Sequence, residues 1–257
     1  MSRTKSSPIA RSWLALVALL CCACACACAC ACAQASVTLS GTRVVFDASE
    51  PEVTIQLSNQ GKQPALIQAW LDTGDERAEP ERIEVPFMVT PTLFRIEAGK
   101  GQALRIIHTG EPLPSNRESL FWLNVLDVPP KTSGGDEVNR LQFAFRTRIK
   151  MMYRPADLSG TPDDAPASLR WTLATDASQR PVLQARNPSA YVVNLAGVEL
   201  QSGGKTYSAG FGHVLPGETA SFPLVGADAT ALPNATVLYS SVDDWGSTHG
   251  HRAAVGQ

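Results

Sequence analysis

Residues 139–155 read NRLQFAFRTRIKMMYRP, and this stretch decides the fold class of the first half of the chain. At a period of two, its residues fall on two faces of opposite character. The apolar face carries Leu141, Phe143, Phe145, Ile149, Met151 and Tyr153, and the other carries Gln142, Arg146, Arg148, Lys150 and Arg154. This alternation predicts a β-strand with one buried face.

The predicted strand is unusually long. About 16 residues span roughly 50 Å at ~3.3 Å per residue, whereas most strands have ~3–10 residues. One small sandwich layer is too short to cover all of it. We therefore expect either a bend in this stretch or a length of apolar strand left for a partner, and we favour the second.

Shorter runs of strand character precede this stretch, separated by turn residues. They occupy residues 37–46, 53–58, 65–71, 87–96, 101–108 and 119–128. Gly41 marks a break or switch in the first run, and Pro91 forbids a plain central strand in the fourth. About seven strands at roughly 8–14 residue spacing, without an amphipathic helix, predict an antiparallel sandwich of immunoglobulin type.

A second β unit is expected after the region rich in Pro, Asp and Ala at residues 154–167. Its strands are expected at residues 169–175, 182–187, 191–200, 205–210, 220–224 and 236–242, with a weak candidate in the tail at 249–255. The expected organisation is an N-terminal leader at 1–35, a first domain at 36–156 and a second at 157–257.

The first 35 residues have the pattern of a cleaved secretory signal peptide. Three basic residues precede an apolar run at 13–20, and small-residue cleavage sites follow at Ala33 and Ala35. An uncleaved anchor is the weaker alternative. A lipoprotein is weaker still, because Leu20 stands before Cys21 where a small residue is needed.

The cysteines and charges of the chain point to an exported protein without disulfides. All seven cysteines lie in the leader, so the mature chain has to be stabilised by its cores alone. Loss of the leader removes three positive charges and moves the net charge from −2 to −5. A mildly acidic balance argues against nucleic acid as a partner.

Motifs of common enzymes are missing from the sequence. Residues 99–101 lack the spacing of a phosphate-binding loop, and no G-x-S-x-G elbow occurs. His249 and His251 fit a solvated tail better than a metal site, because no carboxylate or cysteine cluster accompanies them. We therefore expect no cofactor, no metal and no enzymatic activity.

Several local motifs, taken in their order, resemble the periplasmic chaperones of the chaperone–usher pathway for pilus assembly, the PapD-like family. In the first domain they are TRVVF at 42–46, QAW at 68–70, Thr90-Pro91, RESLFW at 117–122, Pro129-Pro130 and IKMMYRP at 149–155; in the second they are Asn187-Pro188 and DDWG at 243–246. The resemblance implies two immunoglobulin-like sandwiches in an L-shaped arrangement with an inter-domain cleft.

The resemblance also implies a function without ATP. Such chaperones bind pilin subunits that lack the last strand of their own sandwich and deliver them to an outer-membrane usher. By position, Leu141, Phe143 and Phe145 are expected to enter the subunit's groove, with Ile149 on the same face. Arg43 and Lys150 are expected to hold the subunit's C-terminal carboxylate.

A second set of residues is expected to be structural. The resemblance places Glu118, Arg154 and Asp244 in an inter-domain charge cluster. It also implies a cis peptide at Thr90-Pro91, and we group Pro91 with this structural set. The family often has a cysteine pair in its second domain, which this chain lacks, and the short loop at 131–140 suggests the short-loop branch of the family.

Blander interpretations of the same residues exist. The apolar face of the long strand is then an ordinary sandwich core, and Arg43 and Lys150 are ordinary surface cations. The rival functions are a secreted immunoglobulin-like structural or adhesive surface subunit and, less well supported, a secreted β-rich hydrolase. The sequence leaves open whether the free chaperone caps its own strand in a dimer.

Overall fold

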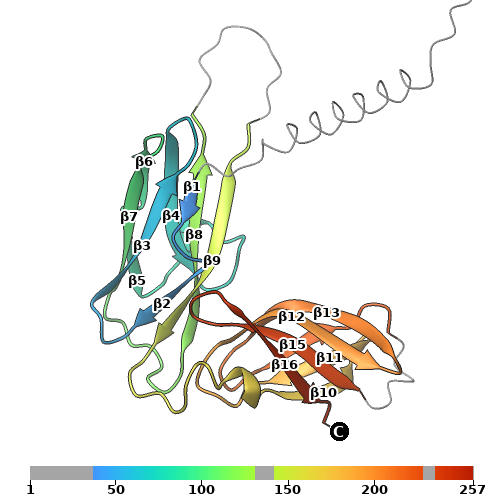
Figure 1. Cartoon of the computed structure of the whole chain (residues 1–257). Coiled ribbons are helices and arrows are strands. Elements are labelled where there is room, and N and C mark those ends of the chain that lie inside the picture. The colour runs from blue at the N-terminus through green and yellow to red at the C-terminus, as the bar shows by residue number, and fades with distance from the viewer. Residues whose placement is uncertain (1–36, 131–141, 228–234, 257) are drawn as a thin grey trace, which may run out of the picture.

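The computed structural model describes residues 37–130, 142–227 and 235–256 as two β-sandwiches that meet at an angle and form an L (Figure 1). The expected leader, Leu141 and the loop at 131–140 lie outside the described residues. Helices within the described ranges are limited to two short 3-10 turns, η1 (Pro80–Arg82) and η2 (Pro166–Ser168). In the same ranges, no helix has the length and apolar character needed to cross a membrane. The expected all-β fold is confirmed.

Among the described residues, the first sandwich contains nine strands in two sheets. One sheet has the order β1-β3-β7-β5 and the other the order β2-β9-β8-β4-β6. The strands are β1 (Val37–Leu39), β2 (Arg43–Asp47), β3 (Glu52–Asn59), β4 (Ala65–Asp72), β5 (Phe87–Thr90), β6 (Leu93–Ile96), β7 (Gly101–His108), β8 (Ser119–Val128) and β9 (Phe145–Arg154).

Nine strands form where about seven were expected because two runs divide. The first run breaks around Gly41, so that β1 joins one sheet and β2 the other. The fourth run breaks at Pro91, which has no N–H to continue a ladder, and β5 and β6 lie in different sheets. The Thr90-Pro91 peptide is cis, as the resemblance implied.

The second sandwich pairs a three-stranded sheet, β10-β11-β14, with a four-stranded sheet, β13-β12-β15-β16. Its strands are β10 (Arg170–Thr175), β11 (Pro181–Arg186), β12 (Val193–Ser202), β13 (Lys205–Val214), β14 (Thr219–Pro223), β15 (Thr236–Val242) and β16 (Thr248–Ala254). The six expected strands before the tail are all present, and β13 extends further than expected.

The weak strand candidate in the C-terminal tail is confirmed, and β16 is an edge strand whose residues are mostly exposed to solvent. Strand β16 pairs antiparallel with β15 along its whole length. His251 stacks on Tyr239 with ring centres 4.9 Å apart and contacts the Ser241 hydroxyl at 2.8 Å. Cross-strand contacts of this kind stabilise an edge that the sequence composition does not favour.

Each sandwich has its own hydrophobic core. Fully buried side chains in the first include Phe46, Ile67, Leu104, Leu123 and Met151, and in the second Leu183, Leu200, Val214 and Val237. Burial of a side chain of this size contributes ~1.5–3 kcal/mol. These cores stabilise the two domains without a disulfide, since all seven cysteines lie at residues 21–32, before the described part of the chain.

Strand β9 is shorter than the expected strand at 139–155. It begins at Phe145, and residues 142–144 are not in a strand. Its antiparallel partner is β8, in which Ser119 pairs with Tyr153 at one end and Asp127 pairs with Phe145 at the other. Pro129 and Pro130 come directly after the last residue of β8. Because prolines donate no backbone hydrogen bond, β8 cannot extend to pair the residues before Phe145.

Candidate functional site

The two expected cations lie side by side in the sheet that faces the second domain. Strands β2 and β9 run parallel, and Arg43 is in register with Lys150. In-register residues of neighbouring strands project from the same face of a sheet. The next pair along, Val44 and Met151, is buried in the first core, which places the two cations on the opposite face, at the inter-domain cleft.

Lys150 reaches from the first domain to the second. Its Nζ donates to Asn194 Oδ1 at 2.7 Å, and the Gly212 carbonyl oxygen lies at 3.4 Å. Burial, and then the charge of Arg43, lower the pKa of Lys150 to about 8. An ammonium group has three donors, so one N–H remains for a further acceptor.

Arg43 also contacts the second domain. Its Nη1 donates to the Val242 carbonyl oxygen at 3.3 Å, while its buried Nε has no hydrogen-bond partner within the described residues. Burial lowers the pKa of Arg43, although the charges of Asp243 and Asp244 raise it. No carboxylate in the described ranges forms an ion pair with Arg43 or Lys150.

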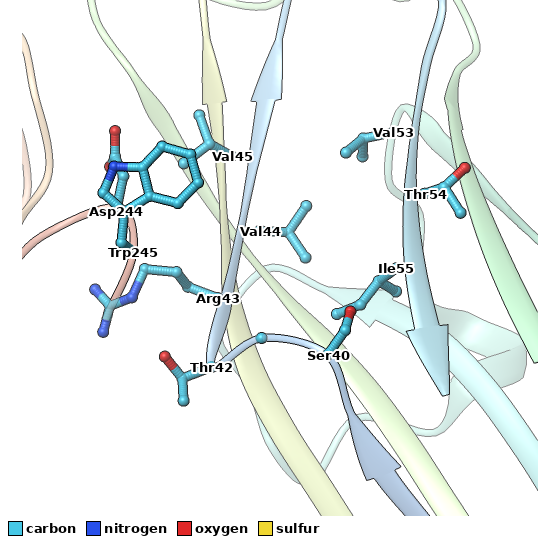
Figure 2. A pocket seen from close by; sticks show the side chains of 11 residues that line it. Ser40, Thr42, Arg43, Val44, Val45, Val53, Thr54, Ile55, Asp244 and Trp245 are labelled. Atoms are coloured by element: carbon cyan, nitrogen blue, oxygen red, sulfur yellow. The ribbon is translucent and has the colours of Figure 1, made fainter. Parts of the chain in front are cut away.

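An open pocket of about 470 Å³ adjoins Arg43. Figure 2 shows Arg43 beside Trp245 and Asp244 on one side of β2, with Val44 and Ile55 on the other. The Trp245 side chain is 93% exposed, in the turn that joins β15 to β16. A cation, an exposed indole and an apolar wall thus lie together at the junction of the domains.

The three residues of the expected charge cluster meet across the domain boundary. Arg154 Nε lies 2.6 Å from Glu118 Oε1 in the first domain, and Arg154 Nη1 lies 2.7 Å from Asp244 Oδ2 in the second. Glu118 Oε2 also accepts a hydrogen bond from the Val192 amide at 2.7 Å. We call Glu118, Arg154 and Asp244 the inter-domain clamp.

Two groups of the clamp, the Glu118 carboxylate and the Arg154 guanidinium, have raised pKa values. Burial raises the pKa of Glu118 by more than the Arg154 charge and the Val192 amide lower it. Burial alone lowers the pKa of Arg154, but its hydrogen bonds to Asp244 and the Glu118 charge raise the pKa well above its ordinary value. The guanidinium is therefore charged at any pH at which the protein is folded.

The apolar residues expected to meet a partner separate into two groups. Phe143 and Phe145 are 60% and 51% exposed, whereas Ile149 is 8% exposed and belongs to the first core. A packed core side chain cannot contact a partner without unpacking, so we remove Ile149 from the partner surface. Leu141 lies outside the described residues.

Part of β9 has an open edge. Strand β2 pairs with β9 from Lys150 to Arg154, and β8 pairs along the other side from Phe145 to Tyr153. In the described part of the chain, the edge from Phe145 to Ile149 has no neighbouring strand on the β2 side. An open edge beside exposed aromatic side chains is a template for addition of another strand.

Pro91 does not belong with the inter-domain charges. It lies between β5 and β6, and both strands are parts of the first sandwich. It lies where the chain crosses from the sheet that contains β5 to the sheet that contains β6. Its expected place in the inter-domain set is therefore corrected.

Sequence reasoning missed the neighbours of Lys150. Asn194 and the Gly212 carbonyl come from the second domain, and Trp122 contacts Lys150 from β8. None of these contacts is local in sequence. Of these neighbours, only Trp122 could have been predicted from the sequence. It lies in the strand before the one that carries the alternating cations, and an aromatic side chain in such a position is a candidate for a cation–π contact.

The histidines and acidic residues suggest no metal centre. His249 contacts Asp243 at 2.8 Å, and the described residues contain no group of three or more ligand side chains placed to hold a metal ion.

Comparison with known proteins assigns this arrangement to the two-domain fimbrial chaperones. Residues 36–159 match the PapD N-terminal domain, described as that of a pili and flagellar-assembly chaperone, and residues 164–253 match the C-terminal domain of the pili assembly chaperone PapD. The chain belongs to the PapD family of pilus-assembly chaperones.

Individual relatives support the same assignment along most of the chain. The chaperone protein FimB/FhaD of Bordetella pertussis is 41% identical over 225 residues, which cover 86% of this chain and 88% of that protein. The structure of the YadV chaperone matches with a TM-score of 0.74 at 35% identity, covering 86% of this chain and 100% of that one. The SafB chaperone, solved in complex with the Salmonella enterica SafA pilin, matches with a TM-score of 0.71 at 30% identity, covering 88% and 99%.

Proposed function

We propose that this protein is a periplasmic chaperone that lends part of β9 to a pilin subunit lacking its last strand, and passes the subunit to an outer-membrane usher. The observation that carries the proposal is the edge of β9 from Phe145 to Ile149, which is open among the described residues and lies next to Arg43 and Lys150, neither of which forms an ion pair within those residues. A relative with this fold, SafB, has been solved with a pilin bound.

The exposed aromatic residues supply the binding energy in this scheme. A subunit without its last strand has an apolar groove, and Phe143 and Phe145 project beside the open edge with rings 6.5 Å apart. Each large side chain transferred from water into the groove contributes ~1.5–3 kcal/mol. Backbone hydrogen bonds to the open edge add to this, and we include Leu141 in the lent segment by its sequence position.

The two cations fix the register of the lent strand. A C-terminal carboxylate in the cleft receives a charge-assisted hydrogen bond from the free N–H of Lys150 and another from the Arg43 guanidinium. Since a slip of one residue reverses the face of every side chain in a strand, holding one end of the subunit aligns Phe143 and Phe145 with its groove.

The clamp maintains the cleft in this proposal. Arg154 connects a buried carboxylate of the first domain to Asp244 in the turn of the second. Buried ion pairs specify geometry more reliably than they add stability. We assign the clamp the role of keeping Arg43 and Lys150 at a constant distance from Val242 and Asn194.

The proposal also covers the export of the chain, its domain boundaries and the state of the free chaperone. Residues 1–35 act as a signal peptide that is removed on export, and the mature chain comprises the domains at 36–156 and 157–257. The free chaperone protects its open edge by pairing with a second copy until a subunit arrives, because exposed edges otherwise aggregate.

Co-expression with a pilin subunit tests the proposal. We expect Lys150→Ala and Phe143→Asp to lose periplasmic subunit, while the matched variants Lys205→Ala and Val225→Asp retain it, because both control residues are exposed and neither is among the hydrogen-bond partners of Arg43 and Lys150. Immunoblots of periplasmic extract measure the subunit. If Lys150→Ala and Phe143→Asp protect the subunit as well as the wild type, the proposal is wrong.

A further inference from the structure

Trp122 on β8 lies directly opposite Lys150 on β9. The two residues are in register in the antiparallel ladder, so their side chains share the face of the sheet that lines the cleft. Lys150 Nζ lies 5.4 Å from the centre of the Trp122 ring, within the ~6 Å range of a cation–π contact. The indole is thus the surface of the first domain against which the ammonium group rests.

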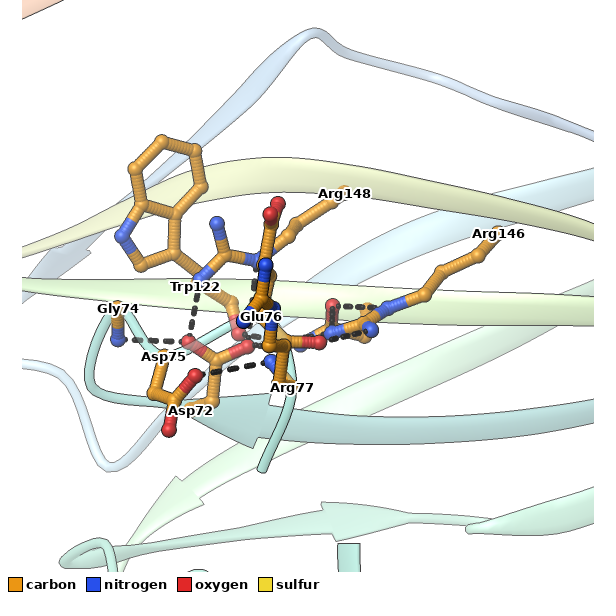
Figure 3. Close-up of polar contacts among 9 residues, drawn as sticks. Asp72, Gly74, Asp75, Glu76, Arg77, Trp122, Arg146 and Arg148 are labelled. Atoms are coloured by element: carbon orange, nitrogen blue, oxygen red, sulfur yellow. Dashed lines mark hydrogen bonds and ion pairs between the residues drawn. The ribbon is translucent and has the colours of Figure 1, made fainter. Parts of the chain in front are cut away.

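The indole is itself held by Arg148. The Arg148 guanidinium carbon lies 4.1 Å from the ring centre. Figure 3 shows Arg148 in turn bound to Asp72, with Nη2–Oδ1 at 2.5 Å and Nε–Oδ2 at 3.2 Å. The Asp72 side chain is 1% exposed and also accepts a hydrogen bond from the Gly74 amide. Arg148 is therefore anchored and keeps the Trp122 ring in one orientation.

The second domain also contacts the indole. His213 meets the Trp122 ring edge-on, with ring centres 6.0 Å apart and planes at 70°. Burial, and then the charge of Lys150, lower the pKa of His213 to about 4. His213 is therefore neutral at neutral pH and adds no positive charge to the cation pair.

We propose that Trp122 is a positioning residue for Lys150: its indole, anchored by Arg148 and Asp72 and touched by His213, directs the ammonium toward the acceptor that enters the cleft. This inference rests on the proposed function, in which that acceptor is a subunit's C-terminal carboxylate. A lysine side chain is long and flexible, and an anion site needs its charge at one point. The contacts of Trp122 provide that constraint.

The same sheet contains a natural control. Trp70 on β4 lies under Arg146, whose guanidinium carbon is 5.0 Å from the Trp70 ring centre. No lysine contact to Trp70 occurs among the described residues. Trp70→Leu therefore removes an equivalent indole–guanidinium contact from the same sheet without touching Lys150.

The experiment compares two forms of one peptide. The purified full-length mature protein is titrated with a peptide of its pilin's C-terminal strand, bearing either a free carboxylate or a C-terminal amide. The ratio of the two affinities reports the carboxylate contact alone. It is measured for the wild type, Trp122→Leu, Trp122→Phe, Trp70→Leu and Lys150→Ala, together with the urea midpoint of each.

We expect Trp122→Leu to reduce the carboxylate-to-amide affinity ratio about tenfold. Trp122→Phe is expected to retain most of the wild-type ratio, and Trp70→Leu is expected to leave the ratio unchanged. An unchanged ratio in Trp122→Leu, or equal losses in Trp122→Leu and Trp70→Leu, overturns the inference. If Lys150→Ala also keeps the wild-type ratio, the carboxylate site of the proposed function fails as well, which separates the two outcomes.

Discussion

The carboxylate of Asp72 on β4 reaches across β8 to the guanidinium of Arg148 on β9, with Nη2–Oδ1 at 2.5 Å. The intervening strand contributes Asn124, whose Nδ2 donates to Asp72 Oδ2 at 2.7 Å. The Asp72 side chain is 1% exposed and that of Arg148 18%. A buried carboxylate therefore connects three strands of the sheet that faces the cleft.

Removing the Asp72 charge is expected to destabilise the first domain. Breaking a buried ion pair by changing one partner leaves the other charge uncompensated, and we expect Asp72→Asn to lower the free energy of unfolding by roughly 3 kcal/mol. Urea unfolding followed by tryptophan fluorescence measures it. Glu97→Gln is the control, since its pair with Arg95 is exposed and is worth less than ~1 kcal/mol. Equal losses in the two variants contradict the prediction.

The same carboxylate predicts a loss of stability in acid. Burial raises the pKa of Asp72, but hydrogen bonds from Arg148, Asn124 and Gly74 outweigh it and lower the pKa below its ordinary value. The charged form therefore stabilises the fold fully above the unfolded pKa of ~3.9, and this contribution disappears as the pH falls through the lower folded pKa. Unfolding free energies measured between neutral and strongly acidic pH test this, with a shallower acid loss expected for Asp72→Asn. Parallel curves for the two proteins exclude the assignment.

Lys150 predicts that binding of a C-terminal carboxylate weakens above pH 8. Burial and the Arg43 charge lower the pKa of Lys150 to about 8, so the ammonium form is lost above that pH in the free protein. We expect the affinity for the free-carboxylate peptide to fall about tenfold per pH unit once the pH exceeds this pKa. Lys150→Arg, which stays charged, is expected to give a flat profile in calorimetric titrations. A decline of equal size in Lys150→Arg assigns the titration to another group.

The two halves of β9 are expected to respond differently to truncation. Phe145→Ala removes a side chain that is 51% exposed and is expected to change the unfolding free energy by no more than about 0.5 kcal/mol. Ile149→Ala opens a cavity in the first core and is expected to cost about 2–5 kcal/mol. Urea titrations of both variants measure this. A loss of unfolding free energy in Phe145→Ala as large as that in Ile149→Ala would show that Phe145 belongs to the core.

The clamp is expected to control the angle between the domains. Asp244→Ala breaks its contact with Arg154 while leaving Glu118 bound to Arg154 and to the Val192 amide. We expect each sandwich to stay folded and the distribution of inter-domain angles to broaden, as measured by small-angle X-ray scattering. Asp176→Ala, which breaks a pair with Arg180 inside the second domain, is the control. Scattering curves identical to wild type for Asp244→Ala would falsify this role of the clamp.

Periodicity predicted the sandwich class and most strand positions because alternation is a local property. The alternating residues around Ile149 and Met151 follow the buried face of β9. The breaks at Gly41 and Pro91 were visible in the sequence, but periodicity did not reveal that each break sends the chain to a different sheet. That outcome depends on pairing between residues far apart in the chain.

The errors share a physical origin. The length of β9 is limited by the residue at which its partner β8 ends. Ile149 continues the pattern of Phe143 and Phe145, but the packing of the first core separates it from them. The family resemblance predicted two contacts between residues far apart in the sequence, and both are present: Arg43 lies beside Lys150, and Arg154 binds Asp244. The sequence did not predict the contacts of Asn194 and Trp122 with Lys150, because these residues are far from Lys150 along the chain.

The division of β9 into a paired part and an open part has a consequence for how this protein evolves. Residues from Lys150 to Tyr153 are paired on both sides, whereas the exposed Phe143 and Phe145 contribute little to the fold that contains them. If these aromatic residues bind the client, as proposed, selection for a new client can act on them while the rest of the strand is kept by its structural role. Under the proposed function, a gene duplicate has a short route to a different fibre, because recognition and stability are then encoded in separate residues of one strand.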